Sequence, residues 1–389
     1  MPPRPEAPGA IPIVLHAELT GLQALHDVTL VTCVGDESGE PEAADELRRA
    51  GVDIHVVDRR QPHGAARWSR RLRLAGAWLE GSRPWRTVWF AAPQVQAVLD
   101  RLGRERRFDI VAVEDNSMGG YRLPPSVPSV LTEHEVHPAL ATRRDGLGFA
   151  ARDARRWARY QPSVWRRFDA VQVFTGGDAE AVARVAPDVA TRVHVNPFGV
   201  ELPDACDPAR ERAGHVLFVG NFTHPPNVDA ALWLAREIVP RLRQRVADAH
   251  LVLVGPAAPD TVTSLAGADV TVVGEVPELR SYLEAAAVVV APVRTGGGMR
   301  MKVLHALAAG KAVVTTTLGA AGLLVGREPA LVVADETEAV ATAVADLLAD
   351  PVRRHTLGAE GRALVAEHHS PGAYARRLTA VYDEVLART

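Results

Sequence analysis

Short runs of valine and other β-branched residues alternate with helical patterns along almost the whole of this 389-residue chain. Such alternation is typical of mostly parallel sheets with helices on both faces. Because the chain exceeds the usual size of one domain, two such sheets are expected. The pattern predicts twelve strands, at residues 28–32, 53–57, 109–113, 129–132, 170–175, 192–195, 215–219, 250–254, 270–273, 288–291, 312–316 and 331–333.

The polar segment 201–214 is predicted to be a linker, because it carries two prolines and shows no hydrophobic period. It separates an N-terminal domain, residues 1–200, from a C-terminal domain, residues 215–370. We expect residues 371–389 to form a helix that packs back on the N-terminal domain. The architecture is therefore predicted to be two doubly wound α/β domains.

The first ten residues have the form of a loop that should follow a strand, yet no strand pattern precedes them. Two interpretations stay open. Either the N-terminal sheet lacks a central strand, or the true start of the protein lies upstream of Met1. We favour the second interpretation, because a sheet without its central strand would expose the edges of the neighbouring strands.

Composition excludes several classes of protein. A net charge of −3 argues against a general nucleic-acid binder. Two cysteines can form neither a disulfide framework nor, by themselves, a zinc site. The sequence shows no secretory signal and no apolar run of the length that a membrane span needs. We therefore expect a cytoplasmic protein.

One segment departs from this ordinary composition. Between Arg59 and Trp89 there are eight arginines and four tryptophans but only one acid, Glu80. The interpretation we favour is an amphipathic helical cover whose arginines are solvated. The alternative is peripheral contact with a membrane surface or with an anionic acceptor, since arginine and tryptophan both suit such an interface.

Lysine is almost absent, because only Lys302 and Lys311 stand among the 44 basic residues. Lys302 lies beside Arg300 and the glycines Gly297 and Gly298, where a helical pattern begins after a strand. Glycine amides at a helix start favour an anion, and the two side chains add full positive charges. This block predicts a phosphate site. Lys311 lies past the helix and is predicted to be a solvated surface residue.

A second candidate segment follows the strand at residues 215–219. Gly220 and Asn221 are predicted either to lie beneath a ligand at the same sheet edge as Lys302 or to form an ordinary turn. Asn227 is predicted to cap the next helix.

A third candidate segment follows the strand at residues 129–132, where His134 stands among acids and a second histidine. Two interpretations of His134 stay open, a catalytic group on a strand-end loop or a structural histidine. A metal site would need more convergent ligands, so we expect none.

These motifs resemble those of the retaining glycosyltransferases of family 4, which have the GT-B fold of two Rossmann-like domains facing across a cleft. The resemblance covers nearly the whole chain. It is carried by Thr132-Glu-His134 and by the segments PEAPGA at 5–10, HDVTLV at 26–31, NPFGVE at 196–201, FVGNF at 218–222, GEVPEL at 274–279, AP at 291–292 and GKAVV at 310–314.

The resemblance implies a transferase that moves a sugar from a nucleotide-diphosphate sugar, of UDP or GDP type, to a hydroxyl of a small-molecule, glycan or lipid-linked acceptor. It implies retention at the anomeric carbon, no metal and no separate cofactor. His134 would act from the acceptor-binding domain, where Gly9 would lie close to the acceptor or a phosphate. Val276 would meet the base through its main chain.

Two departures from the family pattern are visible. The family's two glutamates, eight positions apart, fall here on Gly297 and His305. A subgroup with a Gly-Gly-Gly-x-Arg-x-Lys segment, as in residues 296–302, replaces the first glutamate with loop backbone. Neutral His305 offers one acceptor and one donor in place of a carboxylate. It therefore predicts weaker or different donor binding, or lost activity.

The second departure concerns the donor diphosphate. Residues 221–227 carry neither the arginine nor the lysine that many family members use to hold it. Arg300 and Lys302 are inferred to take over that charge.

Two other functions remain possible on the sequence alone. The first is a catalytically silent nucleotide-sugar-binding or scaffold protein, which His305 and the absent first strand favour. The second is an NAD-dependent oxidoreductase, which ranks last because no Gly-x-Gly-x-x-Gly follows a first strand.

Overall fold

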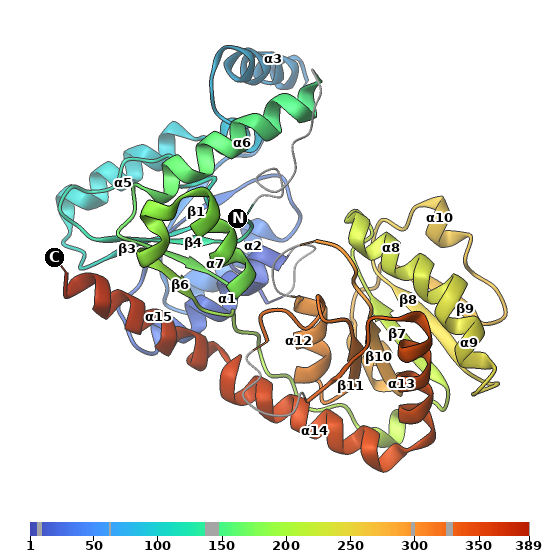
Figure 1. Ribbon diagram of the computed structural model, residues 1–389. Helices are drawn as coiled ribbons and strands as arrows, with labels where there is room; N and C mark the ends of the chain where they lie inside the picture. Colours follow the sequence, from blue (N-terminus) through green and yellow to red (C-terminus); the bar gives the residue numbers. More distant parts are fainter. Residues whose placement is uncertain (6–9, 62–63, 137–147, 297–299, 324–329, 389) are drawn as a thin grey trace. The chain divides into compact units, whose positions relative to one another are not determined.

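The computed structural model describes residues 1–5, 10–61, 64–136, 148–296, 300–323 and 330–388 (Figure 1). The chain divides into two compact units, each described here by itself. Unit 1 comprises Met1–Asn196 and Tyr374–Thr389, and unit 2 comprises Pro197–Ala373. All twelve predicted strands are present, each with ends within two residues of those predicted.

Unit 2 contains one parallel sheet in the order β12-β11-β10-β7-β8-β9. Helices cover the sheet (Figure 1), which explains why its central strands are runs of buried valine and leucine. The strands are β7 (His215–Val219), β8 (His250–Val254), β9 (Val270–Gly274), β10 (Val288–Ala291), β11 (Ala312–Thr315) and β12 (Val332–Val333). The helices are α8 (Pro225–Trp233), α9 (Val239–Arg243), α10 (Asp260–Thr263), α11 (Arg280–Ala285), α12 (Met301–Ala308), α13 (Thr337–Ala349) and α14 (Pro351–His368).

Unit 1 contains two separate parallel sheets, β1-β2 and β3-β4-β5-β6. Among the described residues, no strand precedes β1 and none pairs with both β1 and β3. The strands are β1 (Thr29–Val34), β2 (Asp53–Asp58), β3 (Val111–Glu114), β4 (Ser129–Glu133), β5 (Ala170–Val173) and β6 (Val193–Val195). The helices are α1 (Ala10–Gln23), α2 (Glu40–Arg49), α3 (Ala65–Glu80), α4 (Trp85–Phe90), α5 (Pro93–Glu105), α6 (Phe149–Trp165) and α7 (Gly176–Val185).

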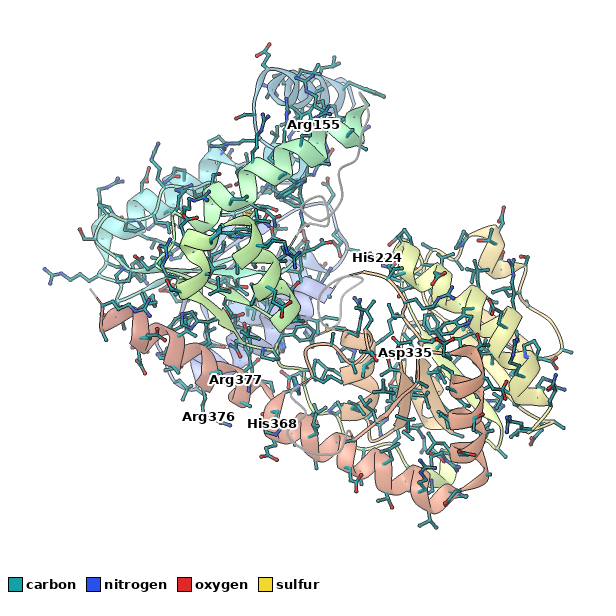
Figure 2. All side chains as sticks on the ribbon, viewed as in Figure 1. Arg155, His224, Asp335, His368, Arg376 and Arg377 are labelled. Carbon is teal, nitrogen blue, oxygen red and sulfur yellow. The ribbon has the colours of Figure 1, made fainter. Side chains whose placement is uncertain are left out.

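The C-terminal helix α15 (Pro371–Leu386) belongs to unit 1 from Tyr374 onward. The buried Tyr374 hydroxyl accepts a hydrogen bond from Gln172 Nε2 at 2.7 Å and donates one to Glu18 Oε2 at 3.1 Å. Arg377, labelled in Figure 2, donates to Asn196 Oδ1 at 2.7 Å. These bonds tie the end of the chain to β5 and to α1.

The segment 201–214 packs on unit 2. Its backbone N–H at Cys206 donates to Ala309 O at 2.9 Å, and its Glu211 carboxylate receives the ammonium of Lys311 at 2.5 Å. The prediction that Lys311 is solvated is wrong, because its side chain is only 2% exposed. Arg354 Nη2 donates to the same carboxylate at 2.9 Å, so Glu211 joins this segment to both β11 and α14.

Candidate functional site

The predicted phosphate site lies at the carboxyl ends of β7 and β10, where α8 and α12 begin. Gly220 closes β7, and its N–H donates to Val254 O at 2.9 Å. The neighbouring β8 is followed by Gly255, whose φ is 148° and where an added Cβ would lie 1.9 Å from the carbonyl oxygen of Gly220. Only glycine fits so close an approach. The two strand ends are thus held together at the edge where open α/β sheets bind ligands.

Lys302 lies in the first turn of α12 and points toward the end of β7. Its ammonium is 4.6 Å from the ring centroid of Phe218 and donates a hydrogen bond to Asn227 Oδ1. Burial, followed by the positive charge of Arg300, lowers the pKa of Lys302 to about 7. Among the described residues, no carboxylate forms an ion pair with Lys302 that would offset this shift.

Asn227 does not cap α8, and the prediction that it would is wrong. The helix begins two residues earlier, at Pro225, because proline is well suited to the first helical turn. The Asn227 side chain instead donates to Asn221 O at 2.6 Å and accepts from Lys302. Asn221 Oδ1 accepts from Thr223 N at 2.9 Å in the turn after β7. Asn227 therefore links the β7 loop to α12.

Arg300 stands at the N-terminal boundary of α12. Its guanidinium donates to Gly296 O at 2.9 Å, and Gly296 has a φ of 98° that favours glycine. Arg300 thus covers the start of the glycine loop beside Lys302. Gly297 and Gly298 lie outside the described residues, and so does Gly9 in unit 1.

His305 follows Lys302 by three residues, so the two side chains share one side of α12. Burial lowers the pKa of His305, which keeps the imidazole neutral at physiological pH. Val276 lies partly exposed in the segment after β9, at the same carboxyl edge of the sheet.

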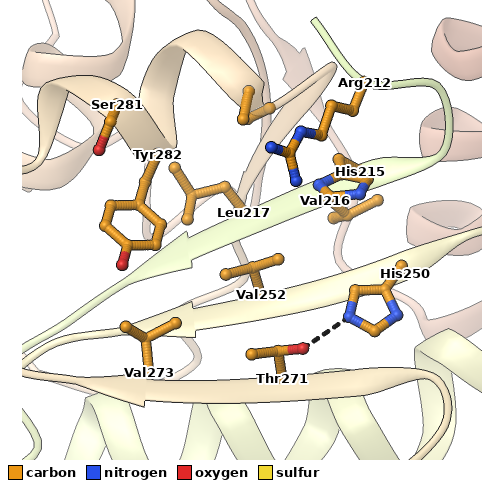
Figure 3. Close-up of a pocket in the computed structure, with 12 residues that line it drawn as sticks. Arg212, His215, Val216, Leu217, His250, Val252, Thr271, Val273, Ser281 and Tyr282 are labelled. Carbon is orange, nitrogen blue, oxygen red and sulfur yellow. Dashed lines mark hydrogen bonds between the residues drawn. The ribbon is translucent and has the colours of Figure 1, made fainter.

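A cavity of about 390 Å³ lies elsewhere in unit 2, and Figure 3 shows residues that line it. It lies between α11 and the β7-β8-β9 part of the sheet, and its lining includes His215, His250 and Tyr282. None of the predicted site residues lines it. It is therefore separate from the Lys302 site.

His134 follows β4 in unit 1 and is largely buried. Its Nε2 lies 2.8 Å from Glu114 Oε2, and its ring packs edge-to-face on Phe174 with centroids 5.2 Å apart. With Nε2–H donated to the carboxylate, Nδ1 would carry the lone pair. Both interpretations of His134 made from the sequence are compatible with this contact.

A buried carboxyl network behind His134 is the main feature that the sequence did not reveal. Burial, and then the charge of Glu114, raise the pKa of Glu18 well above its usual value. Glu18 also receives the Tyr374 hydroxyl, so the network runs from His134 to the C-terminal helix. The polar run that begins at Asp115, after β3, was a signal in the sequence for a site at the end of a strand. In the structure Asp115 adopts a φ of 71°, a strained conformation that is often found at functional sites.

Several solved structures have a similar fold. Anabaena HepE in complex with UDP and glucose matches with a TM-score of 0.65 and 15% identity, covering 97% of this chain and 96% of HepE. A glycosyltransferase from Rickettsia africae matches with a TM-score of 0.60 and 13% identity over 93% of this chain and its own full length. Trehalose-6-phosphate synthase matches with a TM-score of 0.60 and 11% identity, covering 92% of this chain and 99% of the synthase. These likenesses show the GT-B fold.

Sequence models of two transferase families match the two halves of the chain. Residues 42–203 match Glycosyltransferase Family 4, and residues 213–350 match Glycosyl transferases group 1. The chain is a GT-B glycosyltransferase. These matches support glycosyl transfer from a nucleotide sugar. No curated protein sequence matches the chain.

No group of three or more His, Cys, Asp or Glu side chains in the described part of the chain is arranged to hold a metal ion. Within those same ranges, no helix is both long and apolar enough to cross a membrane.

Proposed function

We propose that this glycosyltransferase moves a sugar from a nucleoside-diphosphate sugar to an acceptor hydroxyl with retention and without a metal. The observation that carries the proposal is Lys302, a buried amine whose partner is the neutral oxygen of Asn227. An anion bound against this amine would restore its full charge. The diphosphate of the donor is such an anion, and it lies at the start of α12 in this proposal.

The chemistry follows from that placement. The bond between the anomeric carbon and the diphosphate oxygen breaks, the electron pair leaves with the diphosphate, and the acceptor oxygen forms the new bond as its proton is released. Negative charge grows on the diphosphate in the transition state. Lys302 and Arg300 would stabilise that charge with the glycine-loop amides, so their effect is larger in the transition state than in the ground state.

The donor that we propose first is a UDP sugar, because HepE is known in complex with UDP-glucose. A GDP sugar fits the same diphosphate chemistry. Gly220, Asn221 and Val276 follow strands at the carboxyl edge of the unit 2 sheet, and His305 lies in α12. In this proposal they contact the nucleotide and its ribose. On the acceptor side, the buried His134 of unit 1 would position the reacting groups, and Gly9 would allow close approach to the backbone.

Product analysis tests this function. We expect the full-length protein to release UDP or GDP from one member of a panel of nucleotide sugars, with undiminished rate after treatment with EDTA. Proton NMR of the glycoside should show the anomeric configuration of the donor. An inverted product, or a rate that EDTA abolishes and Mg²⁺ restores, would contradict the retaining, metal-independent mechanism.

The neutral His305 favours one alternative, a protein that binds a nucleotide sugar without turning it over. Its imidazole cannot accept the two hydrogen bonds that a glutamate would accept from a ribose. Tight nucleotide-sugar binding by calorimetry, with neither transfer nor slow donor hydrolysis, would establish that alternative. Release of free nucleotide would exclude it.

Replacing His134 by alanine tests the assignment of unit 1. We expect kcat to fall by about 10²-fold, because misplacing a positioning group costs about that much, while the Kd for the free nucleotide stays unchanged. His26→Ala is the matched control, since His26 is an exposed histidine of the same unit that bonds Thr379 Oγ1 at 2.7 Å. If both variants keep normal turnover, His134 is structural.

A further inference from the structure

Helix α3 presents an apolar stripe that is exposed among the described residues of unit 1. Trp68, Leu72 and Leu79 are 66%, 71% and 53% exposed. At about 100° of rotation per residue, these three positions fall within about 40° of one another on the helix surface. The helix already has a separate buried face, because Trp78 is only 5% exposed. The outward stripe therefore does not serve the packing of unit 1.

The same surface continues onto the first turns of α6, which lies beside α3 in Figure 1. Phe149, at the start of α6, is exposed and stacks on Trp78 with ring centroids 4.6 Å apart. Arg152 Nη2 donates to Leu79 O at 2.8 Å, and its guanidinium lies 5.4 Å from the Trp78 ring centroid. These contacts hold the two helices as one surface, called here the α3–α6 face.

Arginines of α6 line a groove of about 400 Å³ on this face. Arg152, Arg155 and Arg159 are exposed and spaced three and four residues apart, so they project from one side of the helix. Arg155 is labelled in Figure 2, close to α3. The other lining residues are Gly81, Ser82, Arg156, Tyr160 and Ser163, and none of the lining residues is acidic.

The described parts of α3 and α6 carry two acids, and neither lines the groove. Asp153 Oδ1 accepts from Trp78 Nε1 at 2.8 Å and from Trp85 N at 2.6 Å, which fixes that carboxylate between α3 and α4. Glu80 is a single exposed acid at the end of α3. The face is therefore strongly positive on a chain whose net charge is −3.

We propose that the α3–α6 face docks on an anionic lipid bilayer. Trp68, Leu72 and Leu79 would enter the interfacial region, where tryptophan and leucine are favoured. The arginines of the groove would bind lipid phosphates, for which the planar guanidinium is well suited. Charge complementarity and the adjacent apolar stripe together select a bilayer over a free anion, because a free anion would leave the stripe exposed to water.

Vesicle flotation with the full-length protein tests the proposal. We expect the protein to float with phosphatidylcholine vesicles that contain phosphatidylglycerol, not with phosphatidylcholine alone, and to be released at high salt. Replacing Trp68, Leu72 and Leu79 together by serine should lower the binding by at least about tenfold. Arg155→Gln combined with Arg159→Gln should do the same by weakening the electrostatic attraction.

Matched controls come from the exposed surface of α14 in unit 2. Val352→Ser removes an exposed apolar side chain and Arg353→Gln removes an exposed positive charge, both outside the α3–α6 face. Each should leave flotation unchanged. Flotation that the α3 and α6 variants do not reduce would overturn the proposal. So would binding of inorganic pyrophosphate at the groove without vesicle binding, or a lipid-free dimer that the α3 variant dissociates. Because none of these residues belongs to the proposed donor site, the result is independent of whether sugar transfer is observed.

Discussion

Replacing Lys302 by methionine is expected to lower kcat/KM by about 10²–10³-fold, the loss typical for removal of one preorganised group that stabilises transition-state charge. Methionine is unbranched and only one atom shorter, so it keeps most of the apolar stem but removes the ammonium that lies over Phe218. The same variant is expected to raise the stability of ligand-free unit 2. Opposite changes in activity and stability are typical of a residue whose destabilising environment serves function, and a purely structural lysine would not show them.

The stability effect follows from the pKa of Lys302, which burial and Arg300 lower to about 7 in the folded protein. In the unfolded chain the amine titrates near its ordinary value. Between these two pKa values the unfolded state binds more protons than the folded state, so the free energy of unfolding rises with pH from about 7 upward. Below pH 7 the folded protein carries the full cost of burying a charged amine. Methionine removes this penalty, which at pH 7 is of the order of 2–4 kcal/mol.

Thermal melting and calorimetry measure both effects. The wild-type protein should melt at higher temperature as the pH is raised from 7 to 9, whereas the Lys302→Met variant should lack that component. Above pH 7, donor binding to the wild-type protein should be accompanied by uptake of a proton, seen as a binding heat that depends on the ionisation enthalpy of the buffer. The Kd for the donor should increase as the pH rises. A variant that loses activity and melts at lower temperature would show that Lys302 has a structural role instead.

Much of the fold could be predicted because its signals are local. Each strand, such as residues 288–291, is a short valine-rich run bounded by turn residues, and burial on both faces of a parallel sheet requires such runs. The glycine loop and Lys302 were likewise found from neighbouring residues, since a loop after a strand and a helix start are adjacent in sequence. The helix start at Pro225 was missed because Asn227 is an equally good local cap.

The features that were missed depend on residues far apart in the chain. Glu18, Glu114 and Tyr374 come together only when α1, β3 and α15 pack. The separation of β1-β2 from the other strands of unit 1 is different, because a sheet without its central strand was one of the two interpretations that the start of the chain left open. The carboxyl network could not be derived from spacing alone, because tertiary contacts set it.

Replacing Lys311 by methionine is expected to have the converse effects of the Lys302 substitution. Burial alone would raise the pKa of Glu211, but hydrogen bonds from Lys311, His355 and Arg354 lower it, so this carboxylate is ionised inside unit 2. Without Lys311 the buried charge keeps only part of its compensation. We expect the free energy of unfolding to fall by about 2–4 kcal/mol, toward the lower end of the range for a broken buried ion pair because Arg354 remains.

Urea denaturation and steady-state kinetics separate the two lysines. Below its melting temperature, Lys311→Met should keep a near-normal kcat/KM, because Lys311 lies at the amino end of β11 rather than at the carboxyl edge that holds Lys302. Adding Glu211→Gln to Lys311→Met should lower the stability further, since the buried Arg354 guanidinium would then lose the carboxylate that it pairs with at 2.9 Å. If Lys311→Met loses turnover as severely as Lys302→Met while remaining folded, the assignment of the donor site to Lys302 alone among the lysines is wrong.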